Sequence, residues 1–154
     1  MENFDINKTC CFTGHRILSN DFNIDKLEEV INIMLKREFK TFLVGMAIGF
    51  DFKCFEILLS KKQKYNIDII ACIPCKEQSK FYKNKDKETY EEFLKKADKI
   101  VCFGDEYFNG CMQVRNRFMV DNSSVLIAHC KYFKGGAVYT LNYAKKKNKE
   151  IISV

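Results

Sequence analysis

Long apolar runs are missing from this sequence, and with them the usual marks of a membrane or secreted protein. No run approaches the roughly 18 consecutive apolar residues that a transmembrane helix needs. The first ten residues, MENFDINKTC, lack the basic start and apolar stretch of a secretory signal peptide. We therefore expect a cytoplasmic protein that does not interact with a membrane.

Histidine, proline and tryptophan are scarce, with two, one and none in the chain. His15 and His129 stand alone in the sequence, and no second ligand pair completes a zinc site, so we expect no metal. Eight cysteines are present, but 154 residues are enough to bury a core without disulfides. Several of them adjoin apolar runs, where a reduced thiol acts as a small hydrophobic side chain: Cys10, Cys72, Cys102 and Cys130.

Charge is modest, with 26 Lys and Arg against 20 Asp and Glu and a net charge of +6. This balance favours anionic ligands only weakly. Many lysines lie in mixed runs such as residues 83–88, which are typical of a solvated surface. No dense stripe of arginine and aromatic residues indicates nucleic-acid binding, so we do not expect that partner.

Apolar runs alternate with amphipathic stretches along the whole chain. The runs predict strands at residues 9–13, 41–44, 67–73, 99–103, 124–130 and 150–154. Helical spacing predicts helices over 24–39, 50–64, 88–96, 110–122 and 135–147, with an irregular polar segment at 76–87. This alternation predicts one α/β domain over residues 1–154. We expect a Rossmann-like three-layer sandwich, with a mostly parallel central sheet and helices on both faces.

Ligands of such sheets bind beyond the carboxyl ends of the strands, which directs attention to the turns there. Gly14 after the first strand permits a tight turn, and Arg16 offers a fork of donors to a phosphate. His15 between them bonds either a ligand or the neighbouring backbone. After the second strand, Gly45 and Gly49 leave room for a ligand beside a helix N-terminus.

Three further features accompany these turns. Asp51 either caps the second helix or bonds a ribose hydroxyl. Gly135 and Gly136 open the last helix and suit a backbone cradle for phosphate. Arg117 and Asp121 lie four residues apart on one helical face, which fits a surface ion pair, although Arg115 and Arg117 are also within reach of the cleft.

Four segments together resemble the YpsA-like branch of the SLOG superfamily, the group that also contains lonely-guy phosphoribohydrolases and DprA/Smf domains. They are FTGHR at 12–16, GMAIGFD at 45–51, RNRFMVDNSSVLIA at 115–128 and KGGAVYTLNYAKK at 134–146. The resemblance implies a Rossmann-like fold and a pocket for a nucleotide-derived ligand, such as ADP-ribose or an NAD-related molecule. It implies ligand contacts by Gly14, Arg16, Gly45, Gly49, Asp51, Arg117, Asp121, Gly135 and Gly136. Relatives often form dimers through their helices, so the resemblance is also compatible with a homodimer.

The sequence also departs from these relatives. The phosphoribohydrolases carry Pro-Gly-Gly-x-Gly-Thr and then a catalytic glutamate, whereas residues 134–140 here read KGGAVYT with no glutamate after them. We therefore favour a binding module or sensor for a phosphate-bearing nucleotide derivative, and no cofactor is assigned. One alternative is an enzyme that cleaves an N-glycosidic or phosphoribosyl bond, with Asp51 or Asp121 as acid/base. Another is an interaction protein in cell division or stress whose pocket is vestigial.

Other reactive patterns are weaker. Cys72 and Cys75 have Cys-x-x-Cys spacing, but Cys72 fits the core better and Cys75 fits a loop. Cys11 and His15 diverge on a strand that alternates its faces, which argues against nucleophilic catalysis. The acidic residues of the segment after the third strand fit a solvated surface better than an active site: Glu77, Glu88, Glu91 and Glu92.

Overall fold

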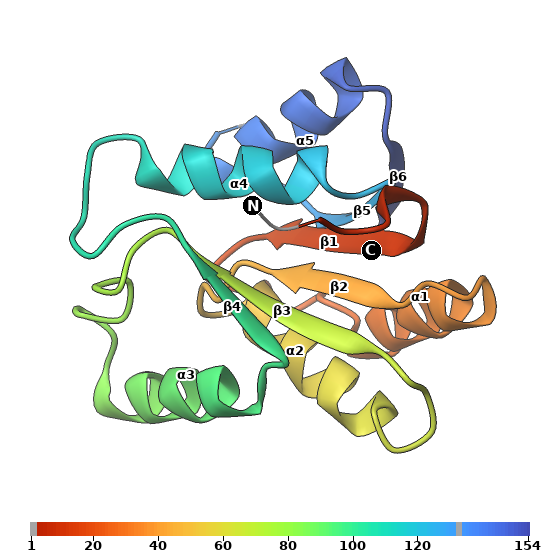
Figure 1. Cartoon of the computed structure of the whole chain (residues 1–154), viewed down its shortest axis with the longest axis horizontal. Coiled ribbons are helices and arrows are strands. Elements are labelled where there is room, and N and C mark those ends of the chain that lie inside the picture. The colour runs from red at the N-terminus through yellow and green to blue at the C-terminus, as the bar shows by residue number, and fades with distance from the viewer. Residues whose placement is uncertain (1–2, 132–133) are drawn as a thin grey trace.

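The fold is one six-stranded parallel sheet between two layers of helices, in a computed structural model that describes residues 3–131 and 134–154 (Figure 1). The strands, in the spatial order β4-β3-β2-β1-β5-β6, are β1 (Thr9–Gly14), β2 (Thr41–Val44), β3 (Asp68–Ile73), β4 (Lys99–Cys102), β5 (Val125–His129) and β6 (Glu150–Ser153). The helices are α1 (Ile24–Lys36), α2 (Phe50–Lys61), α3 (Asn84–Lys96), α4 (Cys111–Asp121) and α5 (Gly136–Lys146), and a short 3₁₀ turn spans Ile6–Lys8.

Both faces of the sheet are covered, which explains why the central strands are nearly continuous apolar runs. In β1, Cys10 and Phe12 join the core beneath α1, α2 and α3, whereas Cys11 joins the core beneath α4 and α5. Figure 1 shows these two helical layers on opposite sides of the sheet. The predicted α/β Rossmann-like sandwich is confirmed, and every strand pair in the described sheet is parallel.

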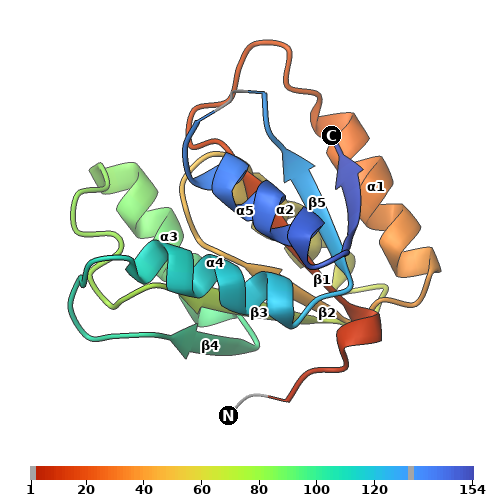
Figure 2. The ribbon, with the colours of Figure 1, turned by 90° about the horizontal axis from the view of Figure 1, so that it is seen from above.

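The chain order reverses beside β1. The first four strands step outward from β1 to β4, and the chain then returns through α4 to place β5 on the other side of β1. Gly14 at the end of β1 pairs in register with His129 at the end of β5. Loops that leave two neighbouring strands in opposite directions open a crevice at their carboxyl ends, so the candidate site is sought at this edge of the sheet. Figure 2 shows β1 and β5 side by side with α5 and α1 on opposite sides of them.

Some predicted boundaries were wrong. The third helix begins at Asn84 rather than residue 88, because a surface helix needs few apolar positions and buries only Tyr90 and Phe93. The first helix ends at Lys36 rather than 39, and Glu38 then takes a φ of +65°. Asn23 caps its start, accepting from two backbone N–H groups at 3.0 and 3.2 Å.

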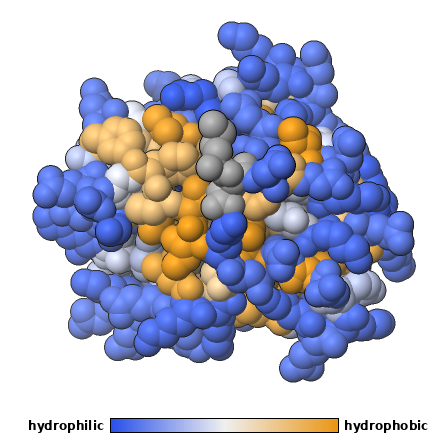
Figure 3. Space-filling model, viewed as in Figure 1, coloured by the Kyte–Doolittle hydropathy of each residue, from blue (hydrophilic) through white to orange (hydrophobic). Residues whose placement is uncertain are grey.

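The exposure of one cysteine also differs from the prediction. Cys72 is fully buried as expected, but Cys102 is exposed because β4 is an edge strand with one open side. The neighbouring Ile100 is 46% exposed. Apolar side chains gather in the middle of the face seen in Figure 1, between mostly hydrophilic margins (Figure 3). Within the described ranges no disulfide joins two cysteines, and none of the helices there is long and apolar enough to cross a bilayer.

Candidate functional site

A cavity of about 250 Å³ lies at the carboxyl ends of the strands, where the chain order reverses. Its walls come from the end of β1, the turn between β2 and α2, helix α4 and the start of α5. Five of the residues predicted from the sequence line it: Gly14, His15, Arg16, Asp51 and Gly136. The remaining lining residues include Ala47, Met112, Arg115, Asn116, Met119 and Ala137.

The turn between β2 and α2 contributes Ala47 to the wall of this cavity, whereas the predicted ligand contacts Gly45 and Gly49 do not line it and serve the packing of the protein itself. A Cβ on Gly49, whose φ is +81°, would lie 2.2 Å from the carbonyl oxygen of Arg16. A Cβ on Gly45 would lie 2.9 Å from Asp51 Oδ2 and 3.1 Å from Arg115 Nη1. Met46 between them takes a φ of +65°. A backbone held in this region by its surroundings stores strain, as is common at binding sites.

Asp51 is the buried anion of the site. Its carboxylate is 7% exposed, and Oδ2 accepts a hydrogen bond from the N–H of Ala47 at 3.2 Å. Oδ1 is buried and has no hydrogen-bond partner among residues 3–131 and 134–154. Burial raises the pKa of Asp51 to about 6, although the positive charge of Arg115 lowers it in part. The N-cap of α2 is Gly49, so Asp51 does not cap the helix from that position.

Arg115 is the buried cation of the site, and it crosses beneath the strand ends. Its Nη1 donates to the carbonyl of Cys72 at 3.2 Å and to the carbonyl of Gly45, and its Nε donates to Asn116 Oδ1 at 2.8 Å. Burial lowers its pKa, and the charge of Asp51 opposes that shift. Arg115 therefore joins the ends of β2 and β3 and supplies positive charge beside Asp51.

Arg117 and Asp121, which the sequence also predicted as ligand contacts, are not among the residues that line this cavity. They face α5, where Arg117 Nη1 donates to Tyr139 Oη at 2.7 Å and the hydroxyl of Tyr143 donates to Asp121 Oδ1 at 2.8 Å. The helical period explains the difference from Arg115, because residues two apart on a helix point to nearly opposite sides. Arg115 lies four residues before the buried Met119, and this spacing was the available signal.

Three helices begin at this edge of the sheet with glycine at the N-cap: α2 at Gly49, α4 at Gly110 and α5 at Gly135. In the part of the chain that the structure describes, none of the three has a side-chain cap. By contrast, α1 starts away from the cavity and is capped by Asn23. The first N–H groups of α5 begin beside the cavity at Gly136, where an anion is favoured.

His15 connects the loop after β1 to the loop after β5. Its Nε2 accepts a hydrogen bond from the backbone N–H of Lys131 at 2.9 Å, and the side chain of Lys131 forms an ion pair with Asp21. The His15 ring lies 6.0 Å from that of His129. Partial burial and the neighbouring His129 lower the pKa of His15, which favours the neutral ring that can accept this bond.

The thiols near the strand ends are poor nucleophiles. Burial raises the pKa of Cys11 to about 12 and raises that of Cys72 further. A protonated, buried thiol is unreactive at neutral pH, and this agrees with the core role expected for Cys72. Cys75, expected in a loop, is only 2% exposed. Among the described side chains, no group of three or more His, Cys, Asp or Glu is placed to hold a metal ion.

The site thus combines a small cavity, the exposed cation Arg16, N–H groups at the start of α5, and a buried carboxylate with one oxygen that no described residue bonds. Cations and amides suit phosphate oxygens, whereas a carboxylate accepts from hydroxyl groups.

Comparison with known proteins identifies the family of this chain. The family model YpsA, described as the YspA SLOG family, matches residues 20–152. The SPβ prophage-derived protein YoqJ of Bacillus subtilis is 33% identical over 136 residues, which cover 79% of this chain and 80% of YoqJ.

Two solved structures share the fold at low sequence identity. DNA processing protein A of Streptococcus pneumoniae superimposes with a TM-score of 0.72 at 16% identity, covering 96% of this chain and 50% of that one, so this chain spans half of that relative. The Helicobacter pylori protein of the same name, described by its single-stranded DNA binding, gives 0.69 at 19% identity over 97% and 66% of the two chains. On the extent of the family match and the identity to YoqJ, the chain belongs to the YpsA family of SLOG proteins.

Proposed function

We propose that this protein binds a phosphate-bearing nucleotide derivative, of the ADP-ribose, NAD or nucleoside phosphate class, as a sensor or binding module. The observation that carries the proposal is Asp51 Oδ1. It is buried in the cavity wall without a partner among the described residues, although a buried carboxylate oxygen is costly to leave unpaired. A ribose hydroxyl would satisfy it once the carboxyl group rotates toward the cavity that Asp51 lines.

Charge and shape around the cavity fit the rest of such a ligand. Arg16 lines the cavity and is exposed, so its guanidinium can turn toward a phosphate. Gly136 begins α5 and lines the same cavity, so backbone N–H groups there can cradle phosphate oxygens. Membership of the SLOG superfamily also supports nucleotide-related binding or processing.

Thermal-shift measurements with ADP-ribose, NAD and AMP test this proposal. A ligand that binds the folded state at 100 times its dissociation constant adds about 2.7 kcal/mol to the free energy of unfolding. We expect at least one of the three to raise the melting temperature, and Arg16→Ala to reduce that rise. Arg117→Ala is the matched control, because that guanidinium bonds Tyr139 outside the cavity. No shift with any of the three compounds would contradict the proposal.

Asp51 also favours a second candidate function, the cleavage of an N-glycosidic bond. A carboxyl group whose pKa is about 6 is suited to proton transfer near neutral pH, and Asp51 lies in the cavity wall whereas Asp121 does not. Incubation of NAD, ADP-ribose and AMP with the protein, followed by chromatography, would reveal turnover. Asp51→Asn should abolish that turnover, and intact ligands after incubation would leave the binding role alone.

A further inference from the structure

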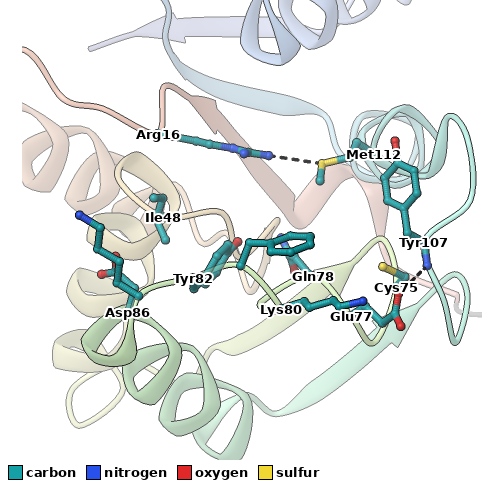
Figure 4. A pocket seen from close by; sticks show the side chains of 12 residues that line it. Arg16, Ile48, Cys75, Glu77, Gln78, Lys80, Tyr82, Asp86, Tyr107 and Met112 are labelled. Carbon is teal, nitrogen blue, oxygen red and sulfur yellow. Dashed lines mark hydrogen bonds between the residues drawn. The ribbon is translucent and has the colours of Figure 1, made fainter.

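A second and larger cavity, of about 660 Å³, adjoins the first at the ends of β2, β3 and β4. The two cavities share two lining residues, Arg16 and Met112. Figure 4 shows Arg16 extending toward Met112 on one side of the larger cavity, with Tyr82 and Gln78 on the opposite side. We refer to the 250 Å³ space as the inner cavity and to the 660 Å³ space as the outer cavity.

The contact between Arg16 and Met112 separates the inner cavity from the outer cavity, and it is a weak interaction. Arg16 Nη2 lies 3.7 Å from the thioether sulfur of Met112, and sulfur is a poor hydrogen-bond acceptor. A phosphate oxygen is a far stronger partner for a guanidinium. A phosphate at this boundary would therefore displace the sulfur contact and leave the two cavities joined.

Three aromatic side chains, Phe81, Tyr82 and Tyr107, line the outer cavity among charged and polar residues. Phe81 is 90% exposed and Tyr107 is 63% exposed, so two of the aromatic rings that line this cavity are open to contact by a ligand. Lys80 Nζ lies 5.7 Å above the ring of Phe81. Exposed rings next to a cation are the usual platform on which nucleic-acid bases stack.

Some of the polar groups in this wall already have partners inside the protein. Gln78 Nε2 donates to the carbonyl of Gly45 at 2.9 Å, and its Oε1 accepts from the hydroxyl of Tyr90 at 3.1 Å. The hydroxyl of Tyr82 donates to the carbonyl of Met46 at 3.2 Å. These groups are therefore unavailable to read the edge of a base, and stacking does not distinguish strongly between bases.

We propose that the outer cavity holds the aromatic base of a nucleoside phosphate, stacked against Phe81 and Tyr107, with little preference between adenine and guanine. This inference rests on the proposed function, because the sugar and phosphate of the same molecule would occupy the inner cavity. Arg16 then lies between the two parts of the ligand, where it binds the phosphate.

Calorimetric titration with AMP, GMP and ribose 5-phosphate tests the assignment, because ribose 5-phosphate lacks the base. We expect AMP to bind the wild-type protein about tenfold more tightly than ribose 5-phosphate, the gain typical of one stacked base. GMP should bind within about threefold of AMP. Phe81→Ala and Tyr107→Ala should each weaken AMP binding by roughly five- to tenfold and leave ribose 5-phosphate unchanged.

Matched variants separate stacking from damage to the fold. Phe81→Tyr and Tyr107→Phe retain a ring at each position and should bind AMP as the wild type does. Both positions are exposed, so all four variants should melt within a few degrees of the wild type.

Each contrary result has a distinct meaning. Binding of ribose 5-phosphate as tightly as AMP, or equal losses for both in Phe81→Ala, would overturn the base assignment and leave the proposed function standing. Failure of all three compounds to bind would overturn the base assignment, and the proposed function would fall with it only if ADP-ribose and NAD also gave no thermal shift. Binding of an eight-nucleotide single-stranded DNA more than a hundredfold tighter than AMP would instead assign the exposed rings to a nucleic-acid strand.

Discussion

Two glycine-containing turns leave the same edge of the sheet, and they use glycine for different reasons. In the turn after β2, a Cβ on Gly45 or Gly49 would collide with Asp51 or with the backbone of Arg16. In the turn after β5, a Cβ on Gly135 or Gly136 would meet no described atom within 4 Å. Glycine in the first turn is thus required by the packing of the protein, whereas the glycines of the second turn are not required by contact with any described residue.

The difference between the turns also separates stability from binding. The packed turn lies against the buried side chains of Asp51 and Arg115 and contributes Ala47 to the wall of the inner cavity. The open turn begins α5 and buries neither of its glycines. Substitutions in the first turn should therefore change the free energy of unfolding, and substitutions in the second should change ligand affinity.

The largest effect is expected for Gly49→Ala. A non-glycine residue at this backbone conformation is strained, and the added Cβ would lie 2.2 Å from a backbone carbonyl oxygen. We expect a loss of at least about 3 kcal/mol in the free energy of unfolding, measured by urea denaturation. Gly110→Ala is the control for a positive φ alone, because Gly110 lies in the left-handed helical region at φ +84° and ψ 5° with no described atom within 4 Å of its Cβ, and it should lose only about 1 kcal/mol. Equal losses of stability in the two variants would show that the contact of Gly49 with the Arg16 backbone does not require glycine.

A smaller and opposite effect is expected for Asp51→Asn. Because the pKa of Asp51 is raised to about 6 in the folded protein, the folded state binds its proton more tightly than the unfolded state does. Stability is therefore lost as the pH rises from about 4 to about 6, by on the order of 2–3 kcal/mol. Asparagine removes that loss, so the variant should be more stable than the wild type at pH 7.5 by about 2 kcal/mol, with no gain near pH 4.

Urea denaturation across pH 4–8 measures this dependence. The two curves should converge in acid and separate above pH 6. A variant that is less stable than the wild type at pH 7.5 would show instead that the charge pair with Arg115 outweighs the cost of burying the carboxylate.

The smallest effect on stability is expected for Gly136→Ala. Gly136 is the first residue of α5, and the added methyl group meets no described atom within 4 Å. Alanine is a better helix former than glycine, so the free energy of unfolding should rise by about 0.5 kcal/mol. A loss of more than about 1 kcal/mol would mean that the turn after β5 is packed as tightly as the turn after β2.

The sequence predicted the fold because its signals are local. Apolar runs bounded by glycine or proline give the strands, and their alternation with helices gives the parallel sheet. It also placed Gly14, His15, Arg16, Asp51 and Gly136 in one region, since each of them closely follows the carboxyl end of a strand.

Features that depend on the direction of a side chain were harder to predict. Arg115 and Arg117 are alike in sequence, and only the helical phase relative to Met119 separates the buried one from the one that faces α5. Phe81 and Tyr107 lie in segments without a periodic pattern, so no sequence signal brought them to one cavity. The raised pKa of Asp51 likewise follows from burial among residues distant in the chain.

The dissociation constant of ADP-ribose for Gly136→Asp and for Gly136→Asn tests the central claim most directly. Both side chains have nearly the same shape, a Cβ at this position meets no described atom within 4 Å, and an aspartate at the start of a helix is not expected to destabilise it. If phosphate binds at the start of α5, the aspartate should weaken ADP-ribose binding by at least tenfold more than the asparagine does. Equal affinities in the two variants would place the phosphate elsewhere and contradict the account.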